Sequence, residues 1–216
     1  MKKIVSLLFV CLSILMKAQD QDPKAKAILD DLSKTTKAYK TITADYTLSF
    51  LNKEKKVVEK QTGKVQIKGN KFKLEIPGNT IVCDGKTLWN FNKDAKEVTI
   101  KNFEAENDDQ LNPSKIFTLY ETGYKFKYDK EEKVGIAACH VIDLYPSVKP
   151  EKKKFHTVKI YVDKAKKQVA KLVMIMKDGG QNVYDIKSLK SNLEILDPVF
   201  VFDTKSFKAD QIIDER

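Results

Sequence analysis

Alternation of apolar and polar residues is the feature of this sequence that most restricts its fold. Every second residue is apolar in the segment 44–50, and the same period of two recurs around Val65 and Ile67 and again over residues 72–76. A period of two places successive side chains on opposite faces of a β-strand. Each segment is therefore predicted to be a strand with one apolar and one polar face.

Turn signals separate these strands from further ones. Asp84-Gly85 lies between two apolar stretches and is a strong hairpin signal. Later strands are predicted over residues 124–128, 135–144, 158–162, 169–176 and 183–189. Roughly ten strands at hairpin spacing indicate a mainly β fold, with one antiparallel sheet rolled toward a barrel. We find no internal repeat and no long linker.

Two short helical segments complete the prediction. The first carries a thin apolar stripe at steps of three and four residues, formed by Ile28, Leu32, Thr35 and Tyr39. The second begins at Asn112-Pro113 and is predicted to end at Gly123. Its apolar members are Ile116, Phe117, Leu119 and Tyr120. Two such helices are too short to cover a large sheet from outside, but they are able to cap the open side of a rolled one.

The N-terminus is predicted to be a secretory signal peptide. Lys2 and Lys3 precede an apolar run that ends at Met16, and a polar sequence follows Ala18. The run is shorter than the roughly 20 residues that span a bilayer. We expect cleavage after Ala18, which leaves residues 19–216 as one exported domain.

The charge distribution argues against a nucleic-acid-binding protein. Lysine and arginine total 40 against 30 acidic residues, a formal charge of +10, yet Arg216 is the only arginine. Nucleic-acid readers commonly use the planar arginine fork. The lysine run 152–154 has two interpretations, attraction to anionic lipid headgroups or a partner, and an ordinary surface loop.

Catalytic and metal-binding patterns are weak. His140 and His156 lie in predicted strands without a Ser/Asp or Cys/His partner pattern, so we predict no catalytic residue, no metal site and no enzyme activity. Cys83 and Cys139 remain after signal cleavage. A disulfide is allowed in an oxidising compartment, but two separate strand cysteines are favoured.

The apolar strand faces have two possible roles. In a small closed barrel these side chains fill the interior, whereas in a wider or gapped barrel they line a cavity for an apolar ligand. From the alternation alone, the two readings are about equally supported. The residues assigned to this face are Tyr46, Leu48, Phe50, Val65, Ile67, Phe72, Leu74, Ile76, Trp89 and Phe91.

A family resemblance gives the second reading more weight. Residues 81–92 read IVCDGKTLWNFN, which resembles the central hairpin of the LolA family, whose pattern runs apolar-apolar-x-Asp-Gly-x-x-Leu-Trp-x-aromatic-Asn. The order of the surrounding features also agrees, from the signal peptide and first helix to the Phe-x-Phe at residues 200–202. The resemblance covers nearly the whole mature chain.

The resemblance implies an unclosed antiparallel β-barrel with a helical lid over an apolar cavity. The ten face residues would bind acyl chains, and Ile28, Leu32, Tyr39, Ile116, Phe117, Leu119 and Tyr120 would form the lid. LolA proteins are periplasmic carriers of outer-membrane lipoproteins without catalytic chemistry or a cofactor. The implied partners are acylated lipoproteins, an inner-membrane lipoprotein-releasing ABC transporter and an outer-membrane acceptor, and we expect a monomer.

One departure from the family pattern and two alternative functions remain. Many members have an arginine that latches the lid after the strand ending at Lys68, where this chain has Lys68-Gly69-Asn70. Lysine lacks the bidentate fork. The alternatives are an envelope factor that senses lipids or lipoproteins, and a carrier of another lipid-like product on the same fold.

Overall fold

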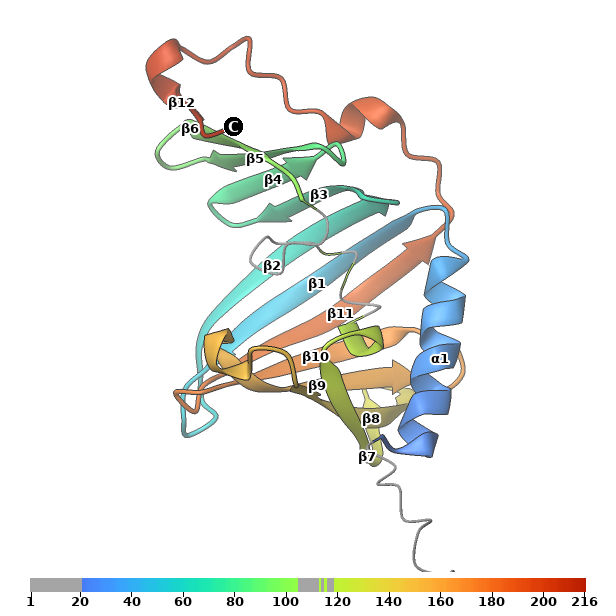
Figure 1. The fold of residues 1–216 in the computed structure, drawn as a ribbon. Helices are drawn as coiled ribbons and strands as arrows, with labels where there is room; N and C mark the ends of the chain where they lie inside the picture. Colours follow the sequence, from blue (N-terminus) through green and yellow to red (C-terminus); the bar gives the residue numbers. More distant parts are fainter. Residues whose placement is uncertain (1–20, 105–112, 114, 116–118) are drawn as a thin grey trace, which may run out of the picture.

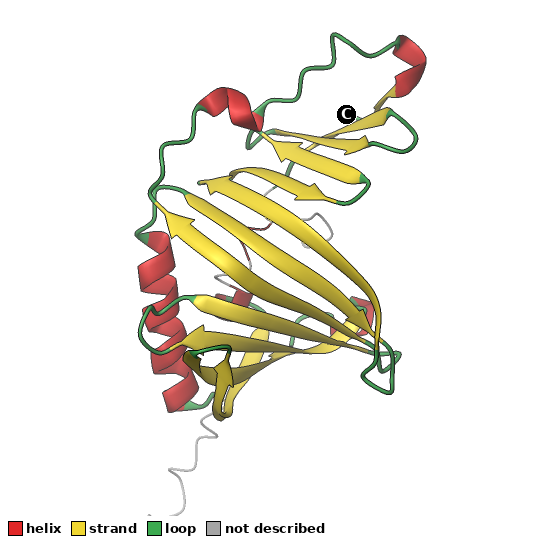
Figure 2. Cartoon of the chain, turned by 180° about the vertical axis from the view of Figure 1, so that it is seen from behind, coloured by secondary structure: helices red, strands yellow, loops and turns green. Residues whose placement is uncertain are grey.

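One curved sheet of twelve strands dominates the computed structural model of the chain (Figures 1 and 2). The structure describes residues 21–104, 113, 115 and 119–216. The signal-peptide segment and residues Ile116 and Phe117 of the expected lid lie outside these residues. The strands are β1 (Ile42–Leu51), β2 (Val57–Lys68), β3 (Lys71–Ile76), β4 (Asn79–Cys83), β5 (Thr87–Asn92), β6 (Glu97–Asn102), β7 (Tyr124–Val134), β8 (Ala137–Pro146), β9 (Phe155–Asp163), β10 (Val169–Met176), β11 (Gln181–Ser191) and β12 (Ile212–Asp214).

The strand order confirms a mainly β fold with an unclosed sheet. The order is β12-β6-β5-β4-β3-β2-β1-β11-β10-β9-β8-β7, so β12 and β7 are the edge strands of the described sheet. All neighbours are antiparallel except β12 and β6, which run parallel. Two meanders, β1 to β6 and β7 to β11, meet where β1 pairs with β11. The join between β1 and β11 extends from Ile42 opposite Ser191 to Leu51 opposite Gln181.

A single α-helix, α1 (Pro23–Lys37), is found among the described residues. Asp22 caps its N-terminus by accepting hydrogen bonds from the backbone N–H groups of Lys24 and Ala25, and Pro23 occupies the first turn. The short 3₁₀ segments are η3 (Leu119–Glu121), η4 (Pro150–Lys152), η5 (Asp197–Phe200) and η6 (Ala209–Gln211). The described residues of the expected second helix, 113, 115 and 119–121, are 3₁₀ and not α-helical. None of the helices among the described residues has the length and apolar character needed to traverse a bilayer.

The sheet curves around α1, so the face that α1 covers is the inner face (Figure 1). Ala25, Leu29 and Leu32 of α1 are fully buried, in one cluster with Ile142 of β8 and Ile160 of β9. The buried stripe differs from the predicted one, because Ile28 is only partly buried and Tyr39 lies beyond the end of the helix. Positions 25, 29 and 32 have helical spacing too, and the curvature of the sheet decides which stripe is covered.

Residues 192–216 cross the sheet as a C-terminal strap. Lys68 of β2 donates hydrogen bonds to the backbone carbonyl of Ile195, at 3.2 Å, and to the carboxylate of Asp197, at 2.8 Å. Lys71 pairs with the same carboxylate at 3.1 Å. Lys68 is the residue nearest to the arginine that latches the lid in the family pattern. Its side chain binds the C-terminal strap and not α1.

Candidate functional site

The inner face is lined by apolar residues of strands β1 to β4. Residues directly opposite in an antiparallel pair share a face, and the register places Ala44 opposite Val65, with Val65 opposite Leu74 and Leu74 opposite Ile81. The inner face therefore includes Tyr46, Leu48 and Phe50 of β1, Val65 and Ile67 of β2, Phe72, Leu74 and Ile76 of β3, and Ile81 and Cys83 of β4. Eight of the ten residues predicted to share a face are brought together here.

The two halves of the inner face are buried to different degrees. Under α1, Ile142, Leu144 and Ile160 are at most 1% exposed and form a packed core. Over β1 to β4 and β11, large apolar side chains remain only partly buried around Tyr46, Leu48 and Leu74. These partly buried residues are Phe50, Val65, Ile76, Ile81, Tyr184 and Ile186. We use the name inner groove for this set of residues on the concave face of the sheet, together with Tyr46, Leu48 and Leu74.

Phe72 and Ile67 belong to the core and do not line the inner groove. Phe72 is 0% exposed and packs edge-to-face against Phe103, with the ring centroids 5.7 Å apart. Ile67 is 5% exposed in the same cluster, together with Ile42 and Cys83. The prediction that these two side chains share the inner face is correct, but they already have protein neighbours on all sides.

Trp89 and Phe91 correct the face predicted from the sequence. In the β4–β5 hairpin, Val82 lies opposite Trp89 and Thr80 opposite Phe91. Val82 and Thr80 alternate with Ile81 and Cys83, so both aromatic rings lie on the outer face. There the Phe91 ring contacts Phe202 at 5.5 Å and Phe207 at 5.3 Å between ring centroids. The C-terminal strap, which alternation within β5 does not reveal, covers these rings.

Tyr46 forms the floor at the centre of the inner groove. Its ring lies over Gly63 of β2, where a Cβ would come within 2.4 Å of the tyrosine Cζ atom, and 6.1 Å from the Tyr184 ring. Burial, with a smaller contribution from the charge of Tyr184, raises the pKa of Tyr46 to about 12. The phenol is therefore neutral at physiological pH, which suits an apolar surface.

Two polar anchors join α1 to β7 and to η3. Asp22 accepts a hydrogen bond at 3.0 Å from the backbone N–H of Tyr128 in β7, and these backbone donors lower the pKa of its carboxyl. Near the other end, Glu121 of η3 accepts hydrogen bonds from Ser33 at 2.6 Å and Lys37 at 2.5 Å. Tyr120 of η3, one of the expected lid residues, is buried in the α1 cluster. Leu119 begins the same turn.

The two histidines lie in β8 and β9 and contact neighbouring polar side chains. His140 faces Tyr128 at 3.4 Å and Glu131 at 3.7 Å, and burial, followed by the nearby lysines, lowers its pKa. His156 contacts Thr157 at 2.8 Å. Within the described ranges, no three His, Cys, Asp or Glu side chains are grouped as a metal site. Cys83 and Cys139 are free thiols in separate core clusters.

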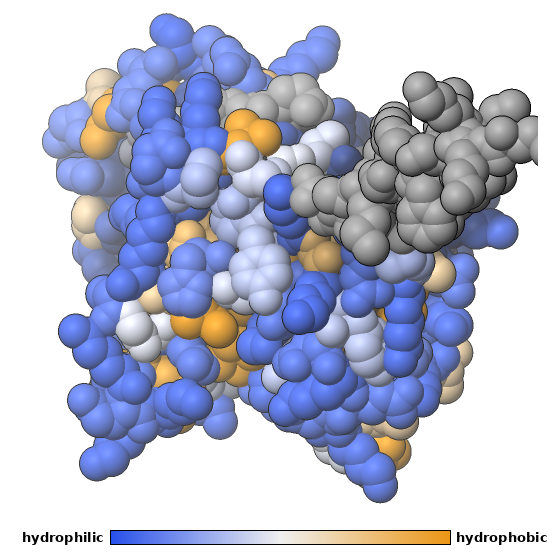
Figure 3. All heavy atoms as spheres, turned by 60° about the horizontal axis from the view of Figure 1, so that its bottom comes forward, coloured by the Kyte–Doolittle hydropathy of each residue, from blue (hydrophilic) through white to orange (hydrophobic). Residues whose placement is uncertain are grey.

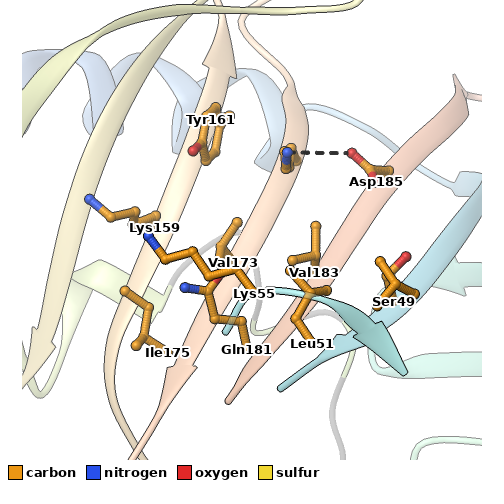
Figure 4. Close-up of a pocket in the computed structure, with 12 residues that line it drawn as sticks. Ser49, Leu51, Lys55, Lys159, Tyr161, Val173, Ile175, Gln181, Val183 and Asp185 are labelled. Atoms are coloured by element: carbon orange, nitrogen blue, oxygen red, sulfur yellow. Dashed lines mark ion pairs between the residues drawn. The ribbon is translucent and has the colours of Figure 1, made fainter. Parts of the chain in front are cut away.

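A second hollow lies on the outer face, where β1, β11, β10 and β9 are adjacent (Figure 4). It has a volume of about 370 Å³ and an apolar floor of Leu51, Val173 and Val183. Lys171 lies above the Tyr161 ring and pairs with Asp185 at 3.9 Å, while Lys159 is bound by Asp129 and Asp143. Because two of its lysines already have acidic partners, this hollow is a weak candidate for an anion site.

Fold and inner face together define a class of protein, an unclosed β-barrel whose helix covers part of an apolar inner surface. The chain belongs to the LolA family, because the model described as outer membrane lipoprotein carrier protein LolA matches residues 37–203. An outer-membrane lipoprotein carrier protein of Histophilus somni is 28% identical over 74% of this chain and 76% of its own length.

Other relatives share the fold or a longer stretch of sequence. An uncharacterised protein of Methanocaldococcus jannaschii is 26% identical over 93% of this chain, and the match spans 58% of that relative's length. An uncharacterised conserved protein of Thermus thermophilus superposes with a TM-score of 0.59 at 14% identity, covering 88% of this chain and 99% of that one. LprF of Mycobacterium bovis gives a TM-score of 0.51 at 13% identity, covering 82% and 98%.

Proposed function

We propose that this protein is a periplasmic carrier that holds the acyl chains of lipoproteins in the inner groove. It would take them from an inner-membrane ABC transporter and deliver them to an outer-membrane acceptor. Membership of the LolA family supports the carrier role. The observation that carries the proposal is the contrast between the packed core under α1 and the partly buried apolar residues beside it.

The chemistry of the inner groove suits an acyl chain. Phe50, Ile76 and Ile81 offer apolar surface, and the neutral Tyr46 phenol adds no charge. Burial of each CH₂ contributes about 0.8 kcal/mol, so two or three acyl chains bind strongly enough to keep a lipoprotein in solution.

Release of the acyl chains requires a second conformation of the protein whose free energy is similar to that of the first. A ligand shifts a conformational equilibrium only by its difference in affinity for the two states. α1 is the element whose movement would widen the inner groove. Its polar anchors join Asp22 to β7 and Ser33 to Glu121 of η3. Its buried apolar stripe packs on β8 and β9, so binding of a ligand or an acceptor must offset the exposure of that stripe. We propose that docking on an acceptor favours the state with these anchors open.

The test is to identify what the purified protein carries. The mature chain is isolated from its own cell envelope without detergent, and bound molecules are identified by mass spectrometry. Triacylated lipoproteins would support the proposal. Recovery of free lipids alone would favour the alternative lipid carrier. Recovery of no acylated ligand, with normal lipoprotein sorting in a deletion strain, would reject both.

Variants then locate the ligand. Phe50→Glu and Ile76→Glu place a charge in the inner groove, where both side chains are only partly buried. Ile136→Glu is the matched control, because Ile136 is fully exposed in the β7–β8 turn. We expect the first two to lose bound lipoprotein at unchanged circular dichroism and the control to retain it. Equal retention by all three would place the ligand elsewhere.

A further inference from the structure

Three loops meet at the end of the sheet opposite α1 and form a rim around that end. The rim consists of the β1–β2 hairpin (residues 53–56), the β8–β9 loop (147–154) and the β10–β11 turn (177–180) (Figure 1). The backbone N–H of Lys177 donates to the Lys154 carbonyl at 3.0 Å. A Cβ on Gly179 would lie 3.1 Å from the Lys53 side chain. The loops are thus in contact and present one surface.

This rim carries a concentrated positive charge. Its three loops contain eight lysines and three acidic residues, a formal charge of +5 in a chain whose total is +10. Lys53, Lys55 and Lys56 are exposed and make no ion pair with a carboxylate of the described residues. Lysines elsewhere, such as Lys159 and Lys68, are paired with aspartates. Charge that has no internal partner is available to an external anion.

Apolar side chains stand among these lysines. Val57 and Val58, directly after the hairpin, are 58% and 66% exposed, and Val148 in the β8–β9 loop is 55% exposed. Figure 3, which brings the lower part of the molecule forward, shows a mostly hydrophilic surface with apolar residues among the hydrophilic ones. Lysines around exposed valines suit the boundary of a bilayer, where cations meet headgroups and short apolar side chains enter the interface.

We propose that the rim is a docking surface for a bilayer containing anionic lipids. Phe50 and Met174 of the inner face lie close to the same end of the sheet, near Leu51 and Met176. A membrane bound at the rim would therefore lie next to the open end of the inner groove. The inference goes beyond the proposed carrier function and does not depend on it, because binding is measured without any lipoprotein.

The test uses the mature chain and lipid vesicles. Sedimentation is measured with vesicles of phosphatidylcholine alone and of phosphatidylcholine mixed with phosphatidylglycerol, across a salt series. We expect binding only to the anionic vesicles, weakening as salt increases. Absence of binding to anionic vesicles would overturn the proposal, and so would equal binding to both kinds.

Charge reversal localises the contact. The rim variant Lys53→Glu/Lys56→Glu/Lys152→Glu should weaken vesicle affinity by at least on the order of a hundredfold, since each lysine contributes severalfold to tenfold. Lys86→Glu/Lys187→Glu/Lys205→Glu makes the same charge change at exposed sites away from the rim. It should have a much smaller effect, and equal losses in the two variants would reject the rim.

The exposed valines allow an independent test of the bilayer contact. Val58→Asp should weaken binding to anionic vesicles, whereas Val201→Asp, at a similarly exposed valine in the C-terminal strap, should not. Soluble polyglutamate distinguishes the other kind of partner. Suppose that polyglutamate abolishes binding of the protein to anionic vesicles and that Val58→Asp binds these vesicles as well as the wild type does. The rim then recognises acidic protein segments, and the assignment to a bilayer is wrong.

Discussion

Tyr46 lies with its ring directly against the backbone of Gly63, across the β1–β2 pair. A Cβ on Gly63 would meet the tyrosine Cζ at 2.4 Å and the backbone carbonyl oxygen of Glu75 at 2.9 Å. Glycine is thus required for this close approach and not for an unusual backbone angle. The floor of the inner groove depends on that fit.

Gly63→Ala should lower the free energy of unfolding by about 1–3 kcal/mol, because the Tyr46 ring must move. Urea denaturation measures the change. In a Tyr46→Ala background, the same substitution should cost less, and the difference gives the coupling between the two residues. A cost that is unchanged by Tyr46→Ala would show that the ring is not the obstacle.

Stability should fall at high pH because of Tyr46. Burial raises the pKa of Tyr46 to about 12, above the ordinary value of 10. The folded state therefore holds the phenolic proton more tightly than the unfolded chain. The resulting contribution is fully present below pH 10 and is lost as pH rises from 10 through 12. Tyr46→Phe should show a smaller decline over this range and lack one late step in the tyrosinate absorbance titration.

The two thiols should be unreactive in the folded protein. Burial raises the pKa of Cys83 to about 11 and also raises that of Cys139. Because the thiolate is the reactive form, Ellman's reagent at about pH 8 should modify neither thiol until urea unfolds the chain. The single variants Cys83→Ser and Cys139→Ser assign each reaction. Rapid labelling of one thiol without denaturant would contradict its buried position.

Asp22→Ala should loosen the start of α1. The substitution removes the acceptor for the backbone N–H groups of Lys24, Ala25 and Tyr128. Hydrogen exchange should accelerate at these amides, while Leu29 keeps its packing in the core. Because hydrogen bonding lowers the pKa of Asp22, the wild-type anchor should also weaken as pH falls through that lowered pKa. Asp31→Ala, on the exposed side of α1, is the control and should leave exchange at Tyr128 unchanged.

Phe91→Ala tests the corrected face. We expect a loss of about 1–3 kcal/mol in the free energy of unfolding, with faster proteolysis within residues 201–216, because Phe202 and Phe207 lose their ring contact. Retention of bound ligand should match the wild type. If Phe91→Ala retains less ligand while the C-terminal strap resists proteolysis as in the wild type, Phe91 belongs to the binding surface after all.

Local patterns predicted much of this molecule. Alternation placed Tyr46, Leu48 and Phe50 on one face, and the turn residues separated most of the strands correctly. The prediction for Trp89 was wrong because register within a hairpin, and not aromatic character, decides which side chains share a face. Pairing of Cys83 with Leu88 puts Leu88 on the inner face and Trp89 on the outer one.

The remaining errors concern contacts between distant segments. The partners of Phe91 lie in the C-terminal strap, and the partner of Lys68 is Asp197. Neither pairing leaves a periodic signal in the sequence. The same holds for the buried stripe of α1, where two stripes had helical spacing and packing against β8 and β9 selected one. Which apolar residues fill the core and which line the inner groove also depends on this packing.

The join between β1 and β11 has a consequence for how the molecule forms. Every other antiparallel neighbour pair in the sheet follows directly along the chain, whereas this one brings residue 42 to residue 191. Closing so long a loop costs conformational entropy before the hydrogen bonds between β1 and β11 can form. Such non-local pairings slow folding. We therefore expect folding kinetics to be governed by this single meeting of two locally formed meanders. A newly synthesised chain would stay susceptible to proteases until this pairing forms.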